Sequence, residues 1–393
     1  MAIDEKLEEL LALSMRGVAE LRESPLGFSI HRLPSWTNMY HQHDNVTERV
    51  ANHASGVTIK LVTEATKVSL TYRALRDQNL ADGYLSPPST VSLTFNDEAG
   101  IETHIFKSSN EGDLRVWNGM QNTGTTEGEN SVAEFELPEV AEGHPREITL
   151  WLPHNCEIQF IDLTANAPLV AAEPKVNWVH YGSSISHVQE AETPADTWPA
   201  KVARALNVDL YSLGLAGSAN VEMFAARTIS NAAADLVSIK VGINTVNGAN
   251  MTLRTFVPAV HSFIDEVRAG HPGVPIVLIS PFVVPAVENN PGPTPMGPDG
   301  KVVGSEWSEN EWVGELSLAR IRQALKAIVA QRTNPDVAGD NVDALLFYVD
   351  GSSIFGGNDV HLLPDGLHPS HDAQELIAGR FLKALKQLKL VAL

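Results

Sequence analysis

The sequence has a single cysteine, few basic residues and no long apolar run. With only Cys156, no intrachain disulfide can form, and this fits a reducing compartment. No window offers the roughly 18 apolar residues that a membrane-spanning helix needs. Lys and Arg number 28 against 48 Asp and Glu, a formal net charge of −20. Nucleic acid and anionic membranes bind clustered positive charge, so we expect neither as a partner.

The first residues also lack the basic flank of a secretory signal. The stretch MAIDEKLEELLALSMRGVAEL is acidic from its fourth residue, so we expect a cytoplasmic protein. Apolar residues at spacings of three and four predict a packing helix within residues 1–25. The stripe consists of Ile3, Leu7, Leu10, Leu11, Val18 and Leu21.

Residues 26–170 alternate apolar and polar side chains with a period of two. The pattern recurs in VTIKL, VSLTYRAL, VSLTF, AEFEL, EITLWL and EIQFIDL, with turn-rich stretches between them. Many short strands with no helix between them predict an antiparallel, jelly-roll-like β-sandwich. Cys156 lies between two such strands, so we expect a buried structural thiol.

Residues 176–393 alternate strand-like and helix-like segments instead. VNWVHY, VDLYSLG, DLVSIKVG, PIVLIS and DALLFYVD have the apolar character of buried strands. FVPAVHSFIDEVRAG, SLARIRQALKAIVAQR and DAQELIAGRFLKALKQL have the period of amphipathic helices. This order predicts an α/β fold with a doubly wound parallel sheet, and such sheets bind ligands at the carboxyl ends of their strands.

Four polar stretches lie at predicted strand ends or in loops of this second half: YGSSIS, LGLAGSAN, VGINTVNG and DGLHPSHD. Together they supply the parts of a serine acyl-transfer site. Ser184 is the candidate nucleophile, His368 the base and Asp365 the group that orients the base. The backbone N–H groups of Ser184 and Gly217 and the side-chain amide of Asn244 are candidate oxyanion donors. An α/β-hydrolase elbow is disfavoured because no second glycine follows Ser184 in a G-x-S-x-G pattern.

These stretches resemble the sequence blocks of the SGNH hydrolase superfamily, the GDSL esterases and acylhydrolases. GSSI matches the Gly-Asp-Ser-Leu block with Ser183 in the aspartate position, and Thr245 follows Asn244 where the family usually has aspartate. The resemblance covers about residues 176–393 and implies a flavodoxin-like sheet. It places the family's nucleophile, oxyanion donors and Asp–His pair on the five candidates already named, and it implies that no metal or organic cofactor is needed.

The first half is also similar to a known module. IHRLPSWT followed by HASGVTIKLVTEATKVSLTY resembles the β-sandwich that precedes a subgroup of these enzymes, including acyltransferase-like members associated with polyketide tailoring. The implied function is cleavage of a small-molecule O-acyl ester, such as an acetylated carbohydrate, through an acyl-enzyme on Ser184. Two alternatives stay open, an acyltransferase that passes the acyl group to an alcohol and a non-catalytic glycan-binding protein.

Several polar residues admit a second interpretation. His187 is an alternative base, although we expect it to help line the pocket. His371 and Asp372 are a rival to the Asp365–His368 pair, but they are adjacent and are expected to enter a helix.

Two further stretches stay open at this point. His41, His43 and Asp44 suggest a metal site, but their spacing matches no strong metal signature, so we expect a polar loop. The Pro- and Gly-rich segment 283–312, with Trp307 and Trp312, is either a surface insertion or a lid or wall of the site.

Overall fold

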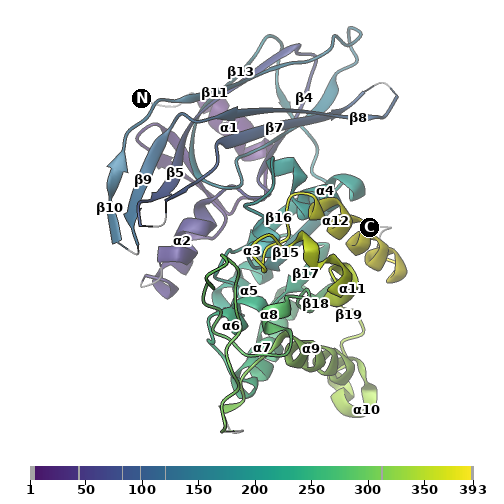
Figure 1. Cartoon of the computed structure of the whole chain (residues 1–393). Coiled ribbons are helices and arrows are strands. Elements are labelled where there is room, and N and C mark those ends of the chain that lie inside the picture. The colour runs from purple at the N-terminus through teal and green to yellow at the C-terminus, as the bar shows by residue number, and fades with distance from the viewer. Residues whose placement is uncertain are drawn as a thin grey trace. The chain divides into compact units, whose positions relative to one another are not determined.

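A computed structural model describes residues 5–42, 45–81, 83–97, 99–119, 121–310 and 313–390. The chain forms two compact units, drawn as ribbons in Figure 1. The first unit comprises residues 1–175, 192–195 and 209–212, and the second comprises residues 176–191, 196–208 and 213–393.

The first unit contains two β-sheets whose apolar faces form one core. One sheet has the order β1-β4-β12-β7-β8, with β14 paired to β4, and all its pairs are antiparallel. Its strands are β1 (Met15–Arg16), β4 (Thr58–Thr63), β7 (Ser89–Asn96), β8 (Glu102–Ser109), β12 (Arg146–Trp151) and β14 (Val170–Ala171).

The other sheet has the order β10-β9-β5-β13-β3-β2, with β11 and β6 both paired to β5. Its pairs are antiparallel except for the parallel pair of β5 with β9. Its strands are β2 (Glu20–Ser24), β3 (Gly27–His31), β5 (Lys67–Asn79), β6 (Tyr84–Leu85), β9 (Asp113–Asn118), β10 (Gln121–Thr126), β11 (Ser131–Glu136) and β13 (Glu157–Ala165). The predicted antiparallel sandwich is therefore confirmed, with one parallel pair in it.

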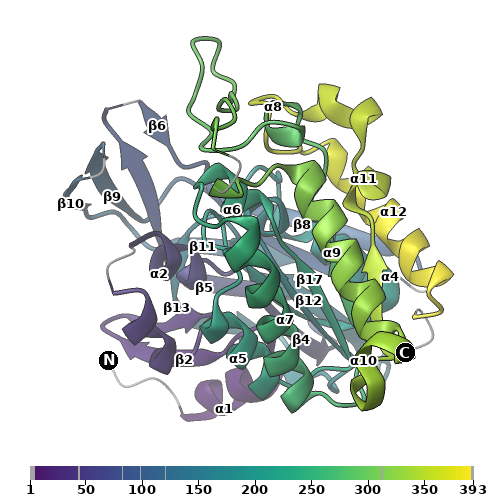
Figure 2. The ribbon, with the colours of Figure 1, turned by 90° about the horizontal axis from the view of Figure 1, so that it is seen from below.

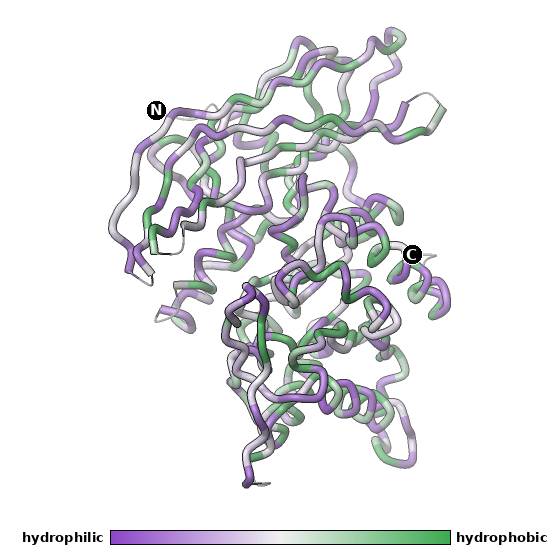
Figure 3. Tube along the Cα trace, in the orientation of Figure 1, coloured by the Kyte–Doolittle hydropathy of each residue, from purple (hydrophilic) through white to green (hydrophobic). Residues whose placement is uncertain are grey.

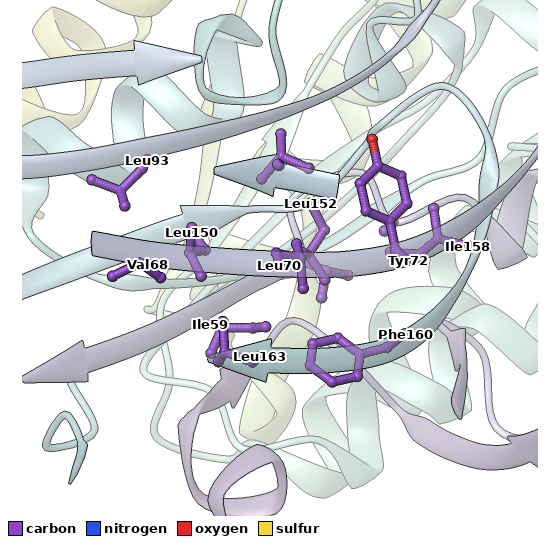
Figure 4. Close-up of a cluster of buried hydrophobic side chains, with 14 of the residues drawn as sticks. Ile59, Val68, Leu70, Tyr72, Leu93, Leu150, Leu152, Ile158, Phe160 and Leu163 are labelled. Atoms are coloured by element: carbon purple, nitrogen blue, oxygen red, sulfur yellow. The ribbon is translucent and has the colours of Figure 1, made fainter. Parts of the chain in front are cut away.

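The alternation of side chains explains this core. Every second residue of β5 faces inward, so Val68, Leu70 and Tyr72 are buried. They share one cluster with Ile59 of β4 and Phe160 of β13, which Figure 4 shows in close-up. Figure 3 shows the same alternation as short hydrophobic and hydrophilic segments along these strands.

Cys156 is part of this apolar cluster. Its side chain is 1% exposed. Burial raises the pKa of the thiol, because the charged thiolate is poorly solvated there. The prediction of a buried structural thiol is confirmed.

The predicted helix over residues 1–25 is only partly correct. The helix α1 (Glu5–Ser14) ends at Ser14, and β1 and β2 follow it. Met15 and Arg16 leave the helix to pair with Ile59 and Thr58 of β4. Gly17 then adopts a φ of +75°, and a Cβ there would lie 2.6 Å from the Leu210 carbonyl oxygen. Two members of the predicted stripe pack against the sandwich core from beyond the helix: Val18 and Leu21.

The expectation that no helix interrupts the sandwich strands is wrong. The 3₁₀ helix η1 (Ser35–Tyr40) and the helix α2 (Asn45–Asn52) lie between β3 and β4. The α2 sequence is mostly polar and offers only a short apolar pattern, in which Val50 and Ala51 are buried. Tertiary burial of these two side chains stabilises a helix that its own composition barely indicates.

The second unit is built on a parallel sheet of order β16-β15-β17-β18-β19, which is 2-1-3-4-5 in chain order. The pairs from β15 through β19 are parallel. The predicted flavodoxin-like sheet is therefore confirmed. The strands of this sheet are β15 (Asn177–Gly182), β16 (Asp209–Gly214), β17 (Leu236–Lys240), β18 (Ile276–Ile279) and β19 (Leu346–Val349), and residues 209–212 of β16 are among those grouped with the first unit.

Helices cover both faces of this sheet, as in a doubly wound fold. Two residues of β15 whose side chains point to opposite faces show this. Trp178 packs against Trp198 of α4 and Phe381 of α12, whereas Tyr181 packs against Phe263 of α7. Figure 2 shows α5, α7 and α9 along one side of the sheet. The main helices are α4 (Trp198–Leu206), α5 (Met223–Asn231), α7 (Leu253–Gly270), α9 (Leu318–Thr333) and α12 (Ala373–Gln387).

Short helices mark the connections of the second unit. They are α3 (Ser184–His187), α6 (Ile243–Asn247), α8 (Pro285–Glu288), α10 (Pro335–Ala338), α11 (Gly351–Ile354) and the 3₁₀ helices η4 (Gly339–Asn341) and η5 (Gly357–Leu362). A further 3₁₀ helix, η2 (Pro194–Asp196), lies where the chain passes from the first unit to the second. Within the described part of the chain, no helix has both the length and the apolar character required to cross a membrane.

The sandwich core predicts a clear stability difference between two strand positions. Leu70 is 0% exposed, so Leu70→Ala should leave a cavity and lower the free energy of unfolding by about 2–5 kcal/mol. Val132 lies on the paired strand β11 but is 52% exposed. Val132→Ala should cost less than about 1 kcal/mol. Urea unfolding followed by circular dichroism measures both, and equal losses would contradict the packing described here.

Candidate active site

The candidate nucleophile lies where β15 turns into α3. Ser183 caps this short helix, since its Oγ accepts a hydrogen bond of 3.3 Å from the Ile185 N–H. Ser184 is the first residue of α3 and is half-buried, whereas Ser183 and Ile185 are buried. Gly182 is required for the close approach of the turn, because a Cβ there would lie 2.2 Å from Ser186 Oγ. The hydroxyl of Ser184 is thus presented at the carboxyl end of the strand.

Ser184, His368 and Asp365 form a continuous chain of hydrogen bonds. Ser184 Oγ lies 2.9 Å from His368 Nε2, although the two residues are 184 positions apart. His368 Nδ1 lies 2.7 Å from Asp365 Oδ2. Because a carboxylate only accepts, Nδ1 carries the proton and Nε2 is left to accept from the hydroxyl. In this tautomer the imidazole can act as a base toward Ser184.

The Asp365 turn holds the imidazole in place. Asp365 Oδ1 accepts backbone hydrogen bonds from Leu367 at 2.9 Å and from His368 at 2.7 Å. Burial opposes ionisation, but these bonds and the His368 imidazole lower the pKa of Asp365 to about 2. The carboxylate is therefore charged across the neutral pH range.

His368 has the opposite shift. Burial disfavours its charged form, but the hydrogen bond to Asp365 and the negative charges of Glu190 and Asp365 outweigh it, so the pKa of His368 is raised above 6.5. The site is thus arranged to stabilise an imidazolium. That is the state a general base reaches after it takes a proton.

The candidate oxyanion donors follow neighbouring strands. Ser184, Gly217 and Asn244 come after β15, β16 and β17, which are adjacent in the sheet. Carboxyl ends of adjacent parallel strands meet at one edge, so these three residues share that edge.

The two loops that carry Gly217 and Asn244 are joined by a hydrogen bond. Gly217 is exposed in a turn closed by a bond of 3.0 Å from the Ser218 N–H to the Leu215 carbonyl, and its φ is +74°. Asn244 Oδ1 accepts from the Ala219 N–H at 3.1 Å, which leaves the NH₂ group of this amide as its donor. Asn244 is buried at the start of α6.

The sequence analysis did not predict a group of hydrogen bonds beneath these loops, here called the brace, which joins Tyr181, Glu222 and the backbone of residues 220–221. Tyr181, the penultimate residue of β15, donates through its hydroxyl to Glu222 Oε2 at 2.5 Å. The same hydroxyl accepts from the Val221 N–H at 3.2 Å, and Glu222 Oε1 accepts from the Asn220 N–H at 2.8 Å. The brace ties the loop after Gly217 to the strand that leads to Ser184. No sequence motif marks it.

The segment 283–312 is attached to the Asp365 turn. The Val302 N–H donates to the Asp365 carbonyl at 3.1 Å, and the Thr294 N–H donates to the Asn247 carbonyl of α6 at 3.2 Å. Met296 and Val302 form an antiparallel bridge that closes the tip.

The described part of segment 283–312 is therefore hydrogen-bonded to the Asp365 turn and to α6. Of the two tryptophans in the segment, Trp307 is held by Arg320, whose guanidinium carbon lies 4.2 Å from the ring centroid. Trp312 lies outside the described residues.

The rival residues take other places. His187 is 0% exposed at the end of α3, so it does not line an open pocket. His371 and Asp372 lie in a turn directly before α12, so the expectation that they enter the helix is wrong. Ser186 Oγ bonds to His180 Nε2 at 2.8 Å, away from His368.

The histidine cluster of the first unit is only partly described. His41 is buried, and its Nε2 lies 3.4 Å from Thr37 Oγ1. His43 and Asp44 lie outside the described residues. Among the residues that the structure does describe, no three His, Cys, Asp or Glu side chains are grouped as a metal site would require.

A flavodoxin-like sheet with serine, histidine and aspartate joined at its carboxyl edge is the architecture of SGNH-type esterases and acylhydrolases. The sequence profile of the GDSL-like lipase/acylhydrolase family matches residues 180–376, half of the chain, and the protein belongs to this family. The resemblance inferred from the four sequence blocks is thereby confirmed. A search of curated proteins found no match.

Solved structures share the fold across both units. The salicylyl-acyltransferase SsfX3 from a tetracycline biosynthetic pathway has a TM-score of 0.75 and 21% identity over 96% of this chain and 95% of its own. A protein from Bacteroides ovatus, described as a GDSL-like lipase, has a TM-score of 0.63 and 16% identity over 96% of each chain. A family two carbohydrate esterase from Clostridium thermocellum, in complex with cellohexaose, has a TM-score of 0.54 and 16% identity over 86% of this chain and 94% of its own.

The hydrogen bond between Asp365 and His368 leads to a prediction about the pKa of His368. NMR of the ring nitrogens should show His368 titrating above pH 6.5, and Asp365→Asn should move the titration to lower pH because the imidazolium loses its charged partner. Asp372→Asn is the matched control, since Asp372 only precedes α12, and it should leave the titration unchanged. An Asp365→Asn protein that titrates like the wild type would contradict the described contact.

Proposed function

We propose that the protein is a serine acylhydrolase that cleaves an O-acyl ester through an acyl-enzyme on Ser184. The observation that carries the proposal is the unbroken hydrogen-bond chain from Ser184 through His368 to Asp365. Membership of the GDSL-like lipase/acylhydrolase family supports it. The side chains at the sheet edge suffice for the chemistry, so the proposal involves no metal or organic cofactor.

In the first half-reaction, Ser184 Oγ attacks the ester carbonyl while its proton passes to His368 Nε2. The oxyanion is stabilised by the backbone N–H groups of Ser184 and Gly217 and by the Asn244 amide. Collapse of the tetrahedral intermediate breaks the ester bond, and His368 gives its proton to the leaving alcohol. Water, activated by the same imidazole, then attacks the acyl group, and Ser184 leaves with the proton restored.

We propose small O-acyl esters as the substrate class, with O-acetylated carbohydrates first among them. Support comes from the structural neighbours, which include a carbohydrate esterase in complex with cellohexaose. Activated esters with a short acyl group are convenient assay substrates for this class. p-Nitrophenyl acetate is therefore the first test substrate.

Replacing the nucleophile tests the mechanism. Ser184→Ala should lower the rate of p-nitrophenyl acetate hydrolysis by about 10³-fold or more, because no covalent intermediate can form. Ser353→Ala is the control, since Ser353 is an exposed serine of α11 in the same unit and should retain full activity. Equal, slow rates for folded wild type and Ser184→Ala would favour a non-catalytic glycan-binding protein.

Acyl transfer to an alcohol is the second candidate function. The similarity to the acyltransferase SsfX3 over 96% of the chain supports this candidate. Both reactions share the first half-reaction, so product analysis must separate them. If the protein is a hydrolase, free acid should remain the main product when alcohols are added at millimolar concentration. A new ester as the main product, formed by wild type and not by Ser184→Ala, would instead establish transfer.

A further inference from the structure

The imidazole of His368 faces two carboxylates. Asp365 Oδ2 lies 2.7 Å from Nδ1, at hydrogen-bond distance. Glu190 Oε1 lies 3.9 Å from the same nitrogen, beyond hydrogen-bond distance but within ion-pair distance. The four sequence blocks include Asp365 and leave Glu190 out. The Nδ1 atom of His368 therefore has Asp365 as its hydrogen-bond partner and the carboxylate of Glu190 as a second negative charge nearby.

The chain directly after the nucleophile brings Glu190 to this place. The helix α3 ends at His187, and the residue that follows, Val188, is buried and has a φ of 58° and a ψ of 58°. This left-handed conformation is rare for a β-branched residue, and such strain persists only where the surrounding structure imposes it. The Ala191 N–H donates to the Val188 carbonyl at 3.2 Å, which closes a turn with Glu190 inside it. The carboxylate is thus positioned by the same turn that ends the nucleophile helix.

The charges around this imidazole are few. The negative charges of Glu190 and Asp365 both act on His368. His368 and Asp365 are in turn the charged groups that act on Glu190. Lys301, on the segment packed against the Asp365 turn, is exposed. The Glu190 side chain is 36% exposed; its partial desolvation raises the pKa of Glu190, and the positive charge of His368 opposes that rise.

We propose that Glu190 is a positioning residue whose carboxylate stabilises the His368 imidazolium formed during acylation. This inference rests on the proposed function. As Ser184 Oγ bonds to the carbonyl carbon, its proton moves to His368 Nε2, and the positive charge on the ring then lies beside both carboxylates. The proton later leaves to the departing alkoxide. Glu190 takes no proton and touches no substrate atom in this scheme; it acts on the rate through the charge of His368.

A pH–rate profile of the full-length protein tests the proposal. In Glu190→Gln the imidazolium loses a stabilising charge, so the acid limb of kcat/KM for p-nitrophenyl acetate should move to lower pH. The weaker base should lower kcat on the plateau by about 3- to 10-fold with KM unchanged. Glu190→Asp keeps the charge and should move the limb back toward that of the wild type.

Glu375→Gln is the matched control for the loss of one negative charge. Glu375 lies on α12, is 80% exposed and pairs with Lys201 at 3.2 Å. Its profile should coincide with that of the wild type, since exposed charges are screened by solvent. A Glu190→Gln limb that coincides with both would overturn the proposal. So would a loss that is equal at every pH and accompanied by a higher KM, because that pattern indicates lost substrate binding.

The titration of His368 by NMR separates this proposal from the proposed function, since it needs no substrate. In folded Glu190→Gln the His368 titration should lie at lower pH than in the wild type. An unchanged titration overturns the role of Glu190 even if the protein is an active esterase. Absence of esterase activity in the wild type overturns the proposed function and with it the catalytic role of Glu190.

Discussion

The carboxylate of Asp365 organises the candidate site. It accepts hydrogen bonds from the backbone of Leu367 and His368 and from the His368 ring. These contacts fold residues 365–368 into a tight turn, and they select the tautomer in which Nε2 can accept from Ser184. The backbone carbonyl of the same residue accepts from Val302, so the long segment 283–310 is attached to this turn as well. The position of the base, its contact with Ser184 and the attachment of segment 283–310 all depend on one side chain and its peptide group.

The parallel sheet supplies the other half of the arrangement. The loops that follow β15, β16 and β17 at the carboxyl edge of the sheet carry Ser184, Gly217 and Asn244. The loops are then braced from below by the Tyr181–Glu222 hydrogen bond and to each other by Ala219 and Asn244. A site for oxyanion formation needs this rigidity, because preorganised donors stabilise developing charge without reorganising.

Two histidines of the second unit show how the neighbouring groups set the pKa of an imidazole. His180 is buried between Ser186 and Ser238, where burial and the charge of Lys240 lower its pKa to about 3, so it stays neutral. His368 is only partly buried and has two carboxylates beside it, so its pKa rises. The pKa values of two imidazoles of one domain are thus shifted in opposite directions because their neighbours differ.

The sequence by itself determined the elements and the chemical groups of this protein. Periods of two and 3.6 predicted the sandwich strands and the α/β alternation, and the four polar blocks predicted Ser184, Asp365 and His368, which the structure joins by hydrogen bonds. These signals are local, since a strand pattern or a turn such as Asp365–His368 is encoded within a few residues.

Tertiary structure alone decided the rest. The helix α1 ends at Ser14, and Met15 and Arg16 pair with Ile59 and Thr58 of β4, which are far away in sequence. The polar α2 forms because Val50 and Ala51 are buried. Glu190 lies beside His368 because Val188, in the left-handed conformation, turns the chain back. The apolar periodicity of the sequence does not predict that contact. Pairings between distant residues depend on how complete elements pack, and packing is a property of the whole fold.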